Sequence, residues 1–229
     1  FAVPCLLFHA MLTSDFSTTF NLSIIIPFYC GSLFCLMAGI FVSLKVFRNR
    51  PGASVSSGFA ATFANTVLLG IPIVQRAYGE AALPTIFSII AIHAPLLITV
   101  GMLVMELVRR DGAPLYKALG VAAVRAFKNP LLWGVGLGLL GNLSGLKLPE
   151  PGTAFFSMMA GAVLPTAVFG LGGALNEYRL ADNWAEALAM STLKLVVHPA
   201  IAWVLMVPVL HVDPTIARYA VLLAAMPAG

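Results

Sequence analysis

The stretch FANTVLLGIPIVQ, residues 63–75, contains residues that a smooth apolar helix would avoid. Pro72 lacks a backbone N–H, and its ring clashes with the carbonyl one turn earlier in a helix. Gly70 permits a close backbone approach, and Asn65 and Thr66 place polar side chains about two turns before the proline. We therefore predict a helix that is interrupted inside this stretch.

The surrounding chain has the composition of an integral membrane protein. Of its 229 residues, 60% are hydrophobic and only 10% are charged, whereas soluble domains carry about 25% charged residues. Mean hydropathy is +0.96, and uncharged runs such as 21–44 and 83–105 exceed the about 20 residues that a helical span needs. These runs are too long and too uniformly apolar for barrel strands. The expected fold class is all-α integral membrane.

Counting apolar runs predicts about eight spans, two of them incomplete. Both ends lie in apolar runs, so we expect a fragment of a longer membrane protein. Basic residues concentrate in 45–50 and 106–128, which lie two spans apart and hence on one side. The positive-inside rule makes that side cytoplasmic, although the loop 177–186 is acidic. We expect a multi-pass protein of the cell inner (plasma) membrane. Apolar spacing over 115–126 fits a surface helix and a solvated linker equally well.

The two halves of the sequence resemble each other in their prolines. Pro4 and Pro165 each stand four residues before a phenylalanine, and each half has a later mid-run proline, Pro72 or Pro227. The separations, 68 residues from 4 to 72 and 62 from 165 to 227, nearly match. Span order places the paired prolines in oppositely directed helices, which predicts inverted repeats with two broken helices that cross if the breaks meet. The predicted divisions are a first repeat over 1–106, a cytoplasmic linker over 107–129 and a second repeat over 130–229.

Paired helix breaks are typical of secondary transporters, whose sites form near the bilayer midplane. By its geometry in a helix, Pro72 frees the carbonyl of Leu68, and Pro227 frees that of Leu223. A half-helix that begins near Pro72 directs its partly positive N-terminus inward, which suits an anion. The alternative is a plain kink with Asn65 bonded to a neighbouring helix. The predicted substrate-binding or crossover residues are Asn65, Thr66, Gly70, Pro72, Met226 and Pro227.

Lys194 lies about two turns inside the apolar run 187–210, and His198 follows one turn later on the same helix face. An ionisable residue inside a span is a candidate functional residue, here for anion attraction or proton coupling. Lys194 could instead extend its amine to the nearer interface, and a lone histidine is more often a satisfied core group. His93 gives a weaker signal.

The motifs FANTVLLGIPI, LLAAMPAG and LKLVVHPAIAW together resemble the auxin efflux carrier (AEC) family across essentially the whole chain, as the second to ninth of ten spans. This resemblance implies two inverted five-helix repeats, a scaffold domain and a transport domain, and a fold like bile-acid symporters and sodium/proton antiporters. It also implies elevator-like transport of carboxylates such as malonate or malate. It carries Asn65, Pro72 and Pro227 over as crossover residues. Val67 departs from the family, which commonly has glycine there.

The leading hypothesis is a secondary transporter, a permease for a small organic anion. The runner-up is a sodium-coupled bile-acid-type symporter. An intramembrane enzyme or a structural membrane subunit is less favoured, because no nucleophile or metal motif is visible and paired breaks would be costly for a structural role. We expect no enzyme activity, no metal, no cofactor and no nucleic-acid partner. Proton or sodium coupling and a homodimer stay open.

Overall fold

The computed structural model describes residues 2–13, 21–109, 130–175 and 183–228, together with positions 120, 124, 127 and 128. Within these ranges the regular elements are helices, accompanied by one isolated β-bridge, which confirms the all-α expectation. The segment 115–126, for which a surface helix or a linker was expected, lies outside the described residues apart from two positions. The first residues of the predicted linker belong to a helix that continues to Arg109.

The chain divides into two compact units, and each unit takes helices from both halves of the sequence. Unit 1 comprises residues 1–15 and 120–182, and unit 2 comprises residues 16–119 and 183–229. Unit 1 contains α1 (Ala2–Thr13), α8 (Pro130–Leu143), α9 (Glu150–Gly161) and α10 (Val163–Leu175). Unit 2 contains α3 (Leu22–Lys45), α4 (Pro51–Ala60), α5 (Ile71–Tyr78), α6 (Leu83–Arg109), α11 (Trp184–Thr192), α12 (His198–Val204) and α13 (Pro214–Ala224).

Unit 1 is held together by close packing of α1 on α8. A Cβ at Gly138 would lie only 2.5 Å from the carbonyl oxygen of Phe8, so glycine is needed for this approach. The Nδ2 of Asn142 donates to the carbonyl of Leu12 over 2.7 Å and satisfies an otherwise unpaired end of α1. Pro165, which the sequence pairs with Pro4, lies exposed within α10.

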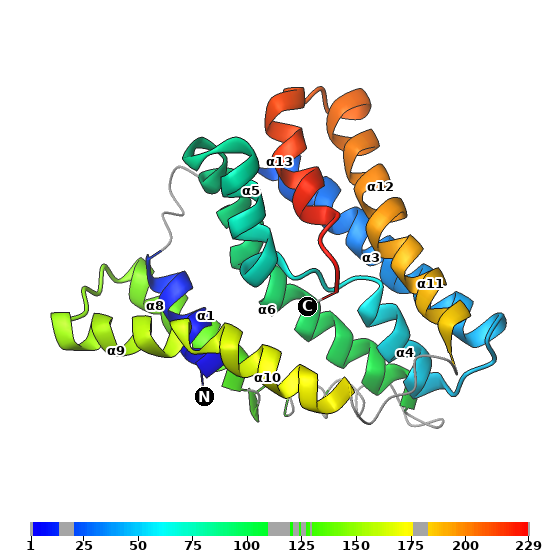
Figure 1. Ribbon diagram of the computed structural model, residues 1–229, viewed down its shortest axis with the longest axis horizontal. Helices are drawn as coiled ribbons and strands as arrows, with labels where there is room; N and C mark the ends of the chain where they lie inside the picture. Colours follow the sequence, from blue (N-terminus) through cyan, green and yellow to red (C-terminus); the bar gives the residue numbers. More distant parts are fainter. Residues whose placement is uncertain are drawn as a thin grey trace. The chain divides into compact units, whose positions relative to one another are not determined.

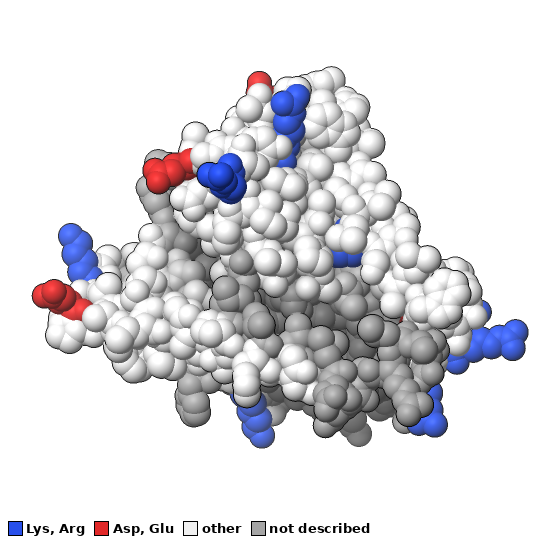
Figure 2. Space-filling view, in the orientation of Figure 1, with Lys and Arg blue, Asp and Glu red and all other residues white. Residues whose placement is uncertain are grey.

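Unit 2 contains the three helical rods that are long and apolar enough to cross a membrane among the described residues: Leu22–Lys45, Glu80–Val108 and Trp184–Val209. The last rod joins α11 and α12 through a π-helical segment, Leu193–Val197. The protein is therefore membrane-embedded. On the face shown in Figure 2, most of the described surface carries neither acidic nor basic side chains, as expected of a surface that meets lipid.

The apolar run 51–75, which contains the stretch 63–75, is not one continuous helix. It consists of α4, a non-helical stretch, a π-helical turn at Thr66–Gly70 and then α5. α4 packs tightly on α3, because Gly58 and Gly39 face each other: a Cβ on Gly58 would lie 2.7 Å from the Leu36 carbonyl oxygen. The start of the interrupted run is thus fixed against the long helix α3.

Candidate functional site

The first interruption lies between α4 and the π-helical turn, at residues 61–65. Its polar groups find partners on α3, α4 and α6 of unit 2. Thr62 donates its hydroxyl to the carbonyls of Gly58 (2.9 Å) and Ser32 (3.2 Å). The N–H of Ala64 donates to Nε2 of His93 on α6 over 3.1 Å. A helix can be broken inside a membrane protein only where such partners replace the lost helical bonds.

α13 ends at Ala224, and we call the coil that follows it, residues 225–228, the second interruption. The carbonyl of Leu223, expected to be freed by Pro227, accepts from the N–H of Met226 over 3.2 Å. The following residues extend beside the first interruption: the N–H of Asn65 donates to the carbonyl of Pro227 over 2.8 Å. Ala64 and Ala228 form an antiparallel bridge. In Figure 1 the coil after α13 accordingly runs beside the coil between α4 and α5.

Most of the other predicted site residues lie near this pairing. A Cβ on Gly70 would lie 2.5 Å from Cδ1 of Leu223 and 3.8 Å from Cγ of Met226, so the glycine allows close contact with the second interruption. Thr66 and Met226 are buried, whereas Pro72 and Pro227 are exposed. Val67, where the family commonly has glycine, packs against the apolar core of the unit.

Lys194 is buried in the π-helical segment between α11 and α12, with 2% of its side chain exposed. Its Nζ donates to the carbonyl of Ala224 over 2.8 Å, at the point where α13 ends. A helix C-terminus carries unpaired carbonyls and a partial negative charge, which favours a donor or a cation there. The amine therefore does not extend to a membrane interface, which was the alternative explanation.

His198 contacts Lys194, as their one-turn spacing predicted, and the geometry fixes its tautomer. Nε2 lies 3.0 Å from the carbonyl oxygen of Phe28, and a carbonyl can only accept, so Nε2 carries the hydrogen. Nδ1 of the neutral ring is then an acceptor for the Lys194 amine, 3.0 Å away. Both ring nitrogens are satisfied, so His198 orients Lys194.

His93 is the residue that the sequence analysis undervalued. Its Nε2 must accept from the Ala64 N–H, which leaves the hydrogen of the neutral ring on Nδ1. Nδ1 has no hydrogen-bond partner among the described residues, although the side chain is 1% exposed. The available sequence signal was a histidine deep within an uncharged span, two residues before Pro95.

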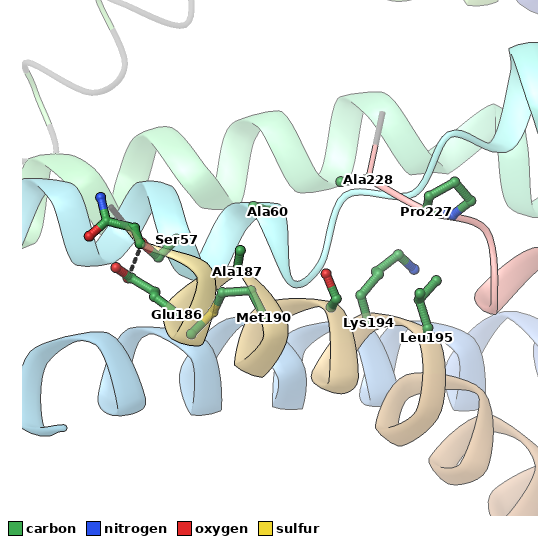
Figure 3. A pocket seen from close by; sticks show the side chains of 11 residues that line it. Ser57, Ala60, Glu186, Ala187, Met190, Lys194, Leu195, Pro227 and Ala228 are labelled. Atoms are coloured by element: carbon green, nitrogen blue, oxygen red, sulfur yellow. Dashed lines mark hydrogen bonds between the residues drawn. The ribbon is translucent and has the colours of Figure 1, made fainter. Parts of the chain in front are cut away.

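A pocket of about 360 Å³ opens beside the paired interruptions. Figure 3 shows Lys194 near Pro227, with Glu186 farther along α11 toward the other end of the lining. Small and apolar side chains form most of the wall between them. The lining residues are Ser57, Ala60, Asn183, Glu186, Ala187, Met190, Ser191, Lys194, Leu195, Pro227 and Ala228.

Glu186 is a second polar group that the sequence analysis did not select. Its carboxylate accepts hydrogen bonds from the hydroxyls of Ser57 (2.7 Å) and Ser43 (2.8 Å). The Nδ2 of Asn49 donates to both oxygens of this carboxylate, over 2.8 and 2.9 Å. These bonds attach the first turn of α11 to α3 and α4. The pocket consequently has an amine at one end and a carboxylate at the other. No group of three or more potential metal ligands occurs among the described residues.

Comparison with known proteins agrees with a membrane transporter. The family model described as "Membrane transport protein" matches residues 1–229. An "Uncharacterized transporter" of Methanothermobacter thermautotrophicus is 27% identical over 203 residues, which are 88% of this chain and 64% of that protein. A "Putative malonate transporter" of Rhizobium meliloti is 27% identical over 199 residues, which are 86% of this chain and 62% of that protein. The chain thus spans less than two thirds of the length of these relatives.

Proposed function

Because the chain belongs to the membrane transport protein family, we propose that it forms the substrate-binding part of a secondary transporter for small carboxylate anions in the cytoplasmic membrane. One observation carries the proposal: the buried amine of Lys194 lies at the pocket beside two paired helix interruptions. Ionisable groups buried in membrane proteins mark substrate or ion pathways, and interrupted helices form the sites of many secondary transporters.

The charge balance of the buried residues favours an anion. The buried polar and charged side chains among the described residues include Lys194 and no aspartate or glutamate. A buried charge is stable only when it is paired, so a carboxylate ligand would supply the missing partner. The lining adds the hydroxyl of Ser191.

The two interruptions are the proposed crossing point of inverted repeats. Each compact unit combines helices from both halves of the chain, as a scaffold domain and a transport domain built from repeats would. We assign unit 2 to the transport domain, because it contains both interruptions, Lys194 and the pocket. Movement of this unit against the scaffold would expose the pocket alternately to the two sides.

Malonate is the first substrate to test, because it appears in the name of one relative. The experiment is counterflow of labelled malonate, malate and acetate into proteoliposomes that contain the full-length protein. Internal carboxylate should drive uptake of external label, and Lys194→Met should reduce that uptake at least roughly tenfold. Equal uptake into protein-free liposomes, or wild-type uptake by Lys194→Met, would overturn the proposal. Repeating the assay with and without a sodium gradient tests sodium-coupled transport.

A further inference from the structure

We propose that Lys194 takes up one proton with each carboxylate that binds, so that its amine is neutral in the empty pocket and an ammonium in the loaded one. The transporter would then be a proton–anion symporter. This inference rests on the proposed carboxylate function and adds the coupling ion and the group that binds it.

The hydrogen bonds of Lys194 match a neutral amine. A neutral amine has two N–H donors and one lone pair, and two acceptors are in place, the Ala224 carbonyl and Nδ1 of His198. The remaining tetrahedral position on Nζ is left for the pocket that Lys194 lines. In the neutral form this position is a lone pair. After protonation it is an N–H that can donate to a carboxylate in the pocket.

The surroundings oppose an ammonium in the empty pocket. The buried described residues provide Lys194 with no carboxylate, and a charge in a low-dielectric interior is costly without one. A carboxylate that enters the pocket removes that cost, because a charge-assisted hydrogen bond forms between the two groups. Anion binding and proton binding therefore favour each other, and this coupling is reciprocal.

The neighbouring titratable groups are already committed to other bonds. His198 on α12 accepts from Lys194 at Nδ1 and donates at Nε2. His93 on α6 uses its lone pair to accept from Ala64. On α3, the thiol of Cys35 donates to the carbonyl of Leu193 over 3.3 Å. Glu186, two turns earlier along the rod, accepts from three side chains, and α13 presents a backbone carbonyl. Among these described groups, Nζ of Lys194 is the one with a lone pair that can take up a proton.

The proton balance is simple. A proton from water on the side to which the pocket opens binds the lone pair of Nζ as the carboxylate enters. The same proton leaves to water when the carboxylate departs on the other side. A monocarboxylate would be carried without net charge, and a dicarboxylate dianion with one net negative charge.

The test counts protons when the purified full-length protein binds a carboxylate. Potassium malonate and potassium acetate are added at pH 8, where carboxylates are fully ionised, in weakly buffered solution with a pH-indicator dye. Calorimetry in two buffers of different ionisation enthalpy repeats the count. We expect one proton taken up for each carboxylate bound, and an affinity that falls about tenfold per pH unit for one linked proton.

Variants separate the amine from a general pH effect. Lys194→Arg keeps a permanent charge, so it should bind the anion with no proton uptake and little pH dependence. Lys194→Met should lose at least roughly tenfold in affinity. Lys45→Met, which removes an exposed lysine at the end of α3, should behave as wild type.

The outcomes distinguish the two proposals. Carboxylate binding by the wild-type protein without proton uptake would overturn the coupling inference and leave the carboxylate function standing. Absence of any malonate or acetate binding would overturn both. Proton uptake that persists in Lys194→Met would show that another group binds the proton. The wild-type proton count decides the inference even if Lys194→Arg does not fold.

Discussion

Asn65 and Pro227, from the two sequence segments of unit 2, are joined by a backbone hydrogen bond of 2.8 Å. Because this bond uses the N–H of Asn65 and the carbonyl of Pro227, it does not depend on either side chain. The flanking bridge between Ala64 and Ala228 is likewise made by the backbone. The pairing of the two interruptions can therefore be separated experimentally from the chemistry of the side chains around it.

Replacing the Asn65 side chain should affect transport more than folding. In Asn65→Ala the backbone bond to Pro227 remains possible, so the pairing of the two interruptions should be retained. Carboxylate counterflow should fall at least roughly tenfold, since a site that loses a polar contact to its substrate loses about 1–3 kcal/mol. Asn65→Asp should reduce counterflow further, because the carboxylate that it introduces repels the anionic substrate. Wild-type counterflow in Asn65→Ala would remove this residue from the site.

The His93 side chain should stabilise the first interruption. In His93→Leu the buried N–H of Ala64 loses its acceptor, which should cost about 1–3 kcal/mol of unfolding free energy. His93→Gln retains an acceptor of similar reach and should lose less. Thermal unfolding of the purified protein in detergent measures both variants. Equal melting temperatures for His93→Leu and wild type would show that the Ala64 bond does not contribute.

The sequence indicated an interruption in the run 63–75, because proline and glycine act locally on the backbone. The structure has its non-helical stretch at residues 61–65, ahead of Gly70 in the π-helical turn and Pro72 in the first turn of α5. The one-turn spacing of Lys194 and His198 also predicted their contact, since residues four apart share a helix face. These features need only neighbouring residues in the sequence.

The roles of His93 and Glu186 could not be read in the same way. His93 accepts from a backbone group 29 residues away, and Glu186 accepts from side chains 129 to 143 residues away. Such partners are set by tertiary packing, which residue spacing does not encode. Local interruptions also divide apolar runs such as 51–75 into shorter helices.

Glu186 should bias the pocket against dianions. It lies eight residues before Lys194 on the same rod, about 12 Å along a helix, so a dicarboxylate bound at Lys194 extends its second charge into the field of this carboxylate. Glu186→Gln should raise the affinity for malonate relative to acetate by a few-fold to about tenfold. Competition of both anions against labelled substrate measures the ratio. Glu150→Gln, an exposed site on α9, is the matched control, and an unchanged ratio in Glu186→Gln would contradict the expectation.

Gly58 should be intolerant of even one methyl group. The added Cβ of Gly58→Ala would lie 2.7 Å from the Leu36 carbonyl oxygen and 2.6 Å from Cγ1 of Ile40, and a backbone carbonyl within a long helix cannot move aside easily. Overpacking of this kind costs about 1–3 kcal/mol. In α8, a Cβ on Gly136 meets nothing within 4 Å, so Gly136→Ala should be neutral or slightly stabilising. Thermal unfolding compares the two, and equal melting temperatures would show that α3 and α4 separate without cost.

Asp213 should stabilise the start of α13 in a pH-dependent way. Its carboxylate accepts from the backbone N–H of Thr215 over 2.7 Å as the helix N-cap. This bond is the main cause that lowers the pKa of Asp213 below its ordinary value of 3.8.

Because the folded pKa of Asp213 is lowered, its stabilising effect is complete above pH 3.8 and is lost as the pH falls through the folded value. Asp213→Ala should therefore melt at a lower temperature than wild type at pH 7, and the difference should shrink below pH 3.8. Asp213→Asn keeps an uncharged cap, so it should lie between the two at pH 7 and should add no pH dependence of its own. If the melting temperatures of Asp213→Ala and wild type differ by the same amount at pH 7 and below pH 3.8, the charge of this carboxylate does not contribute to stability.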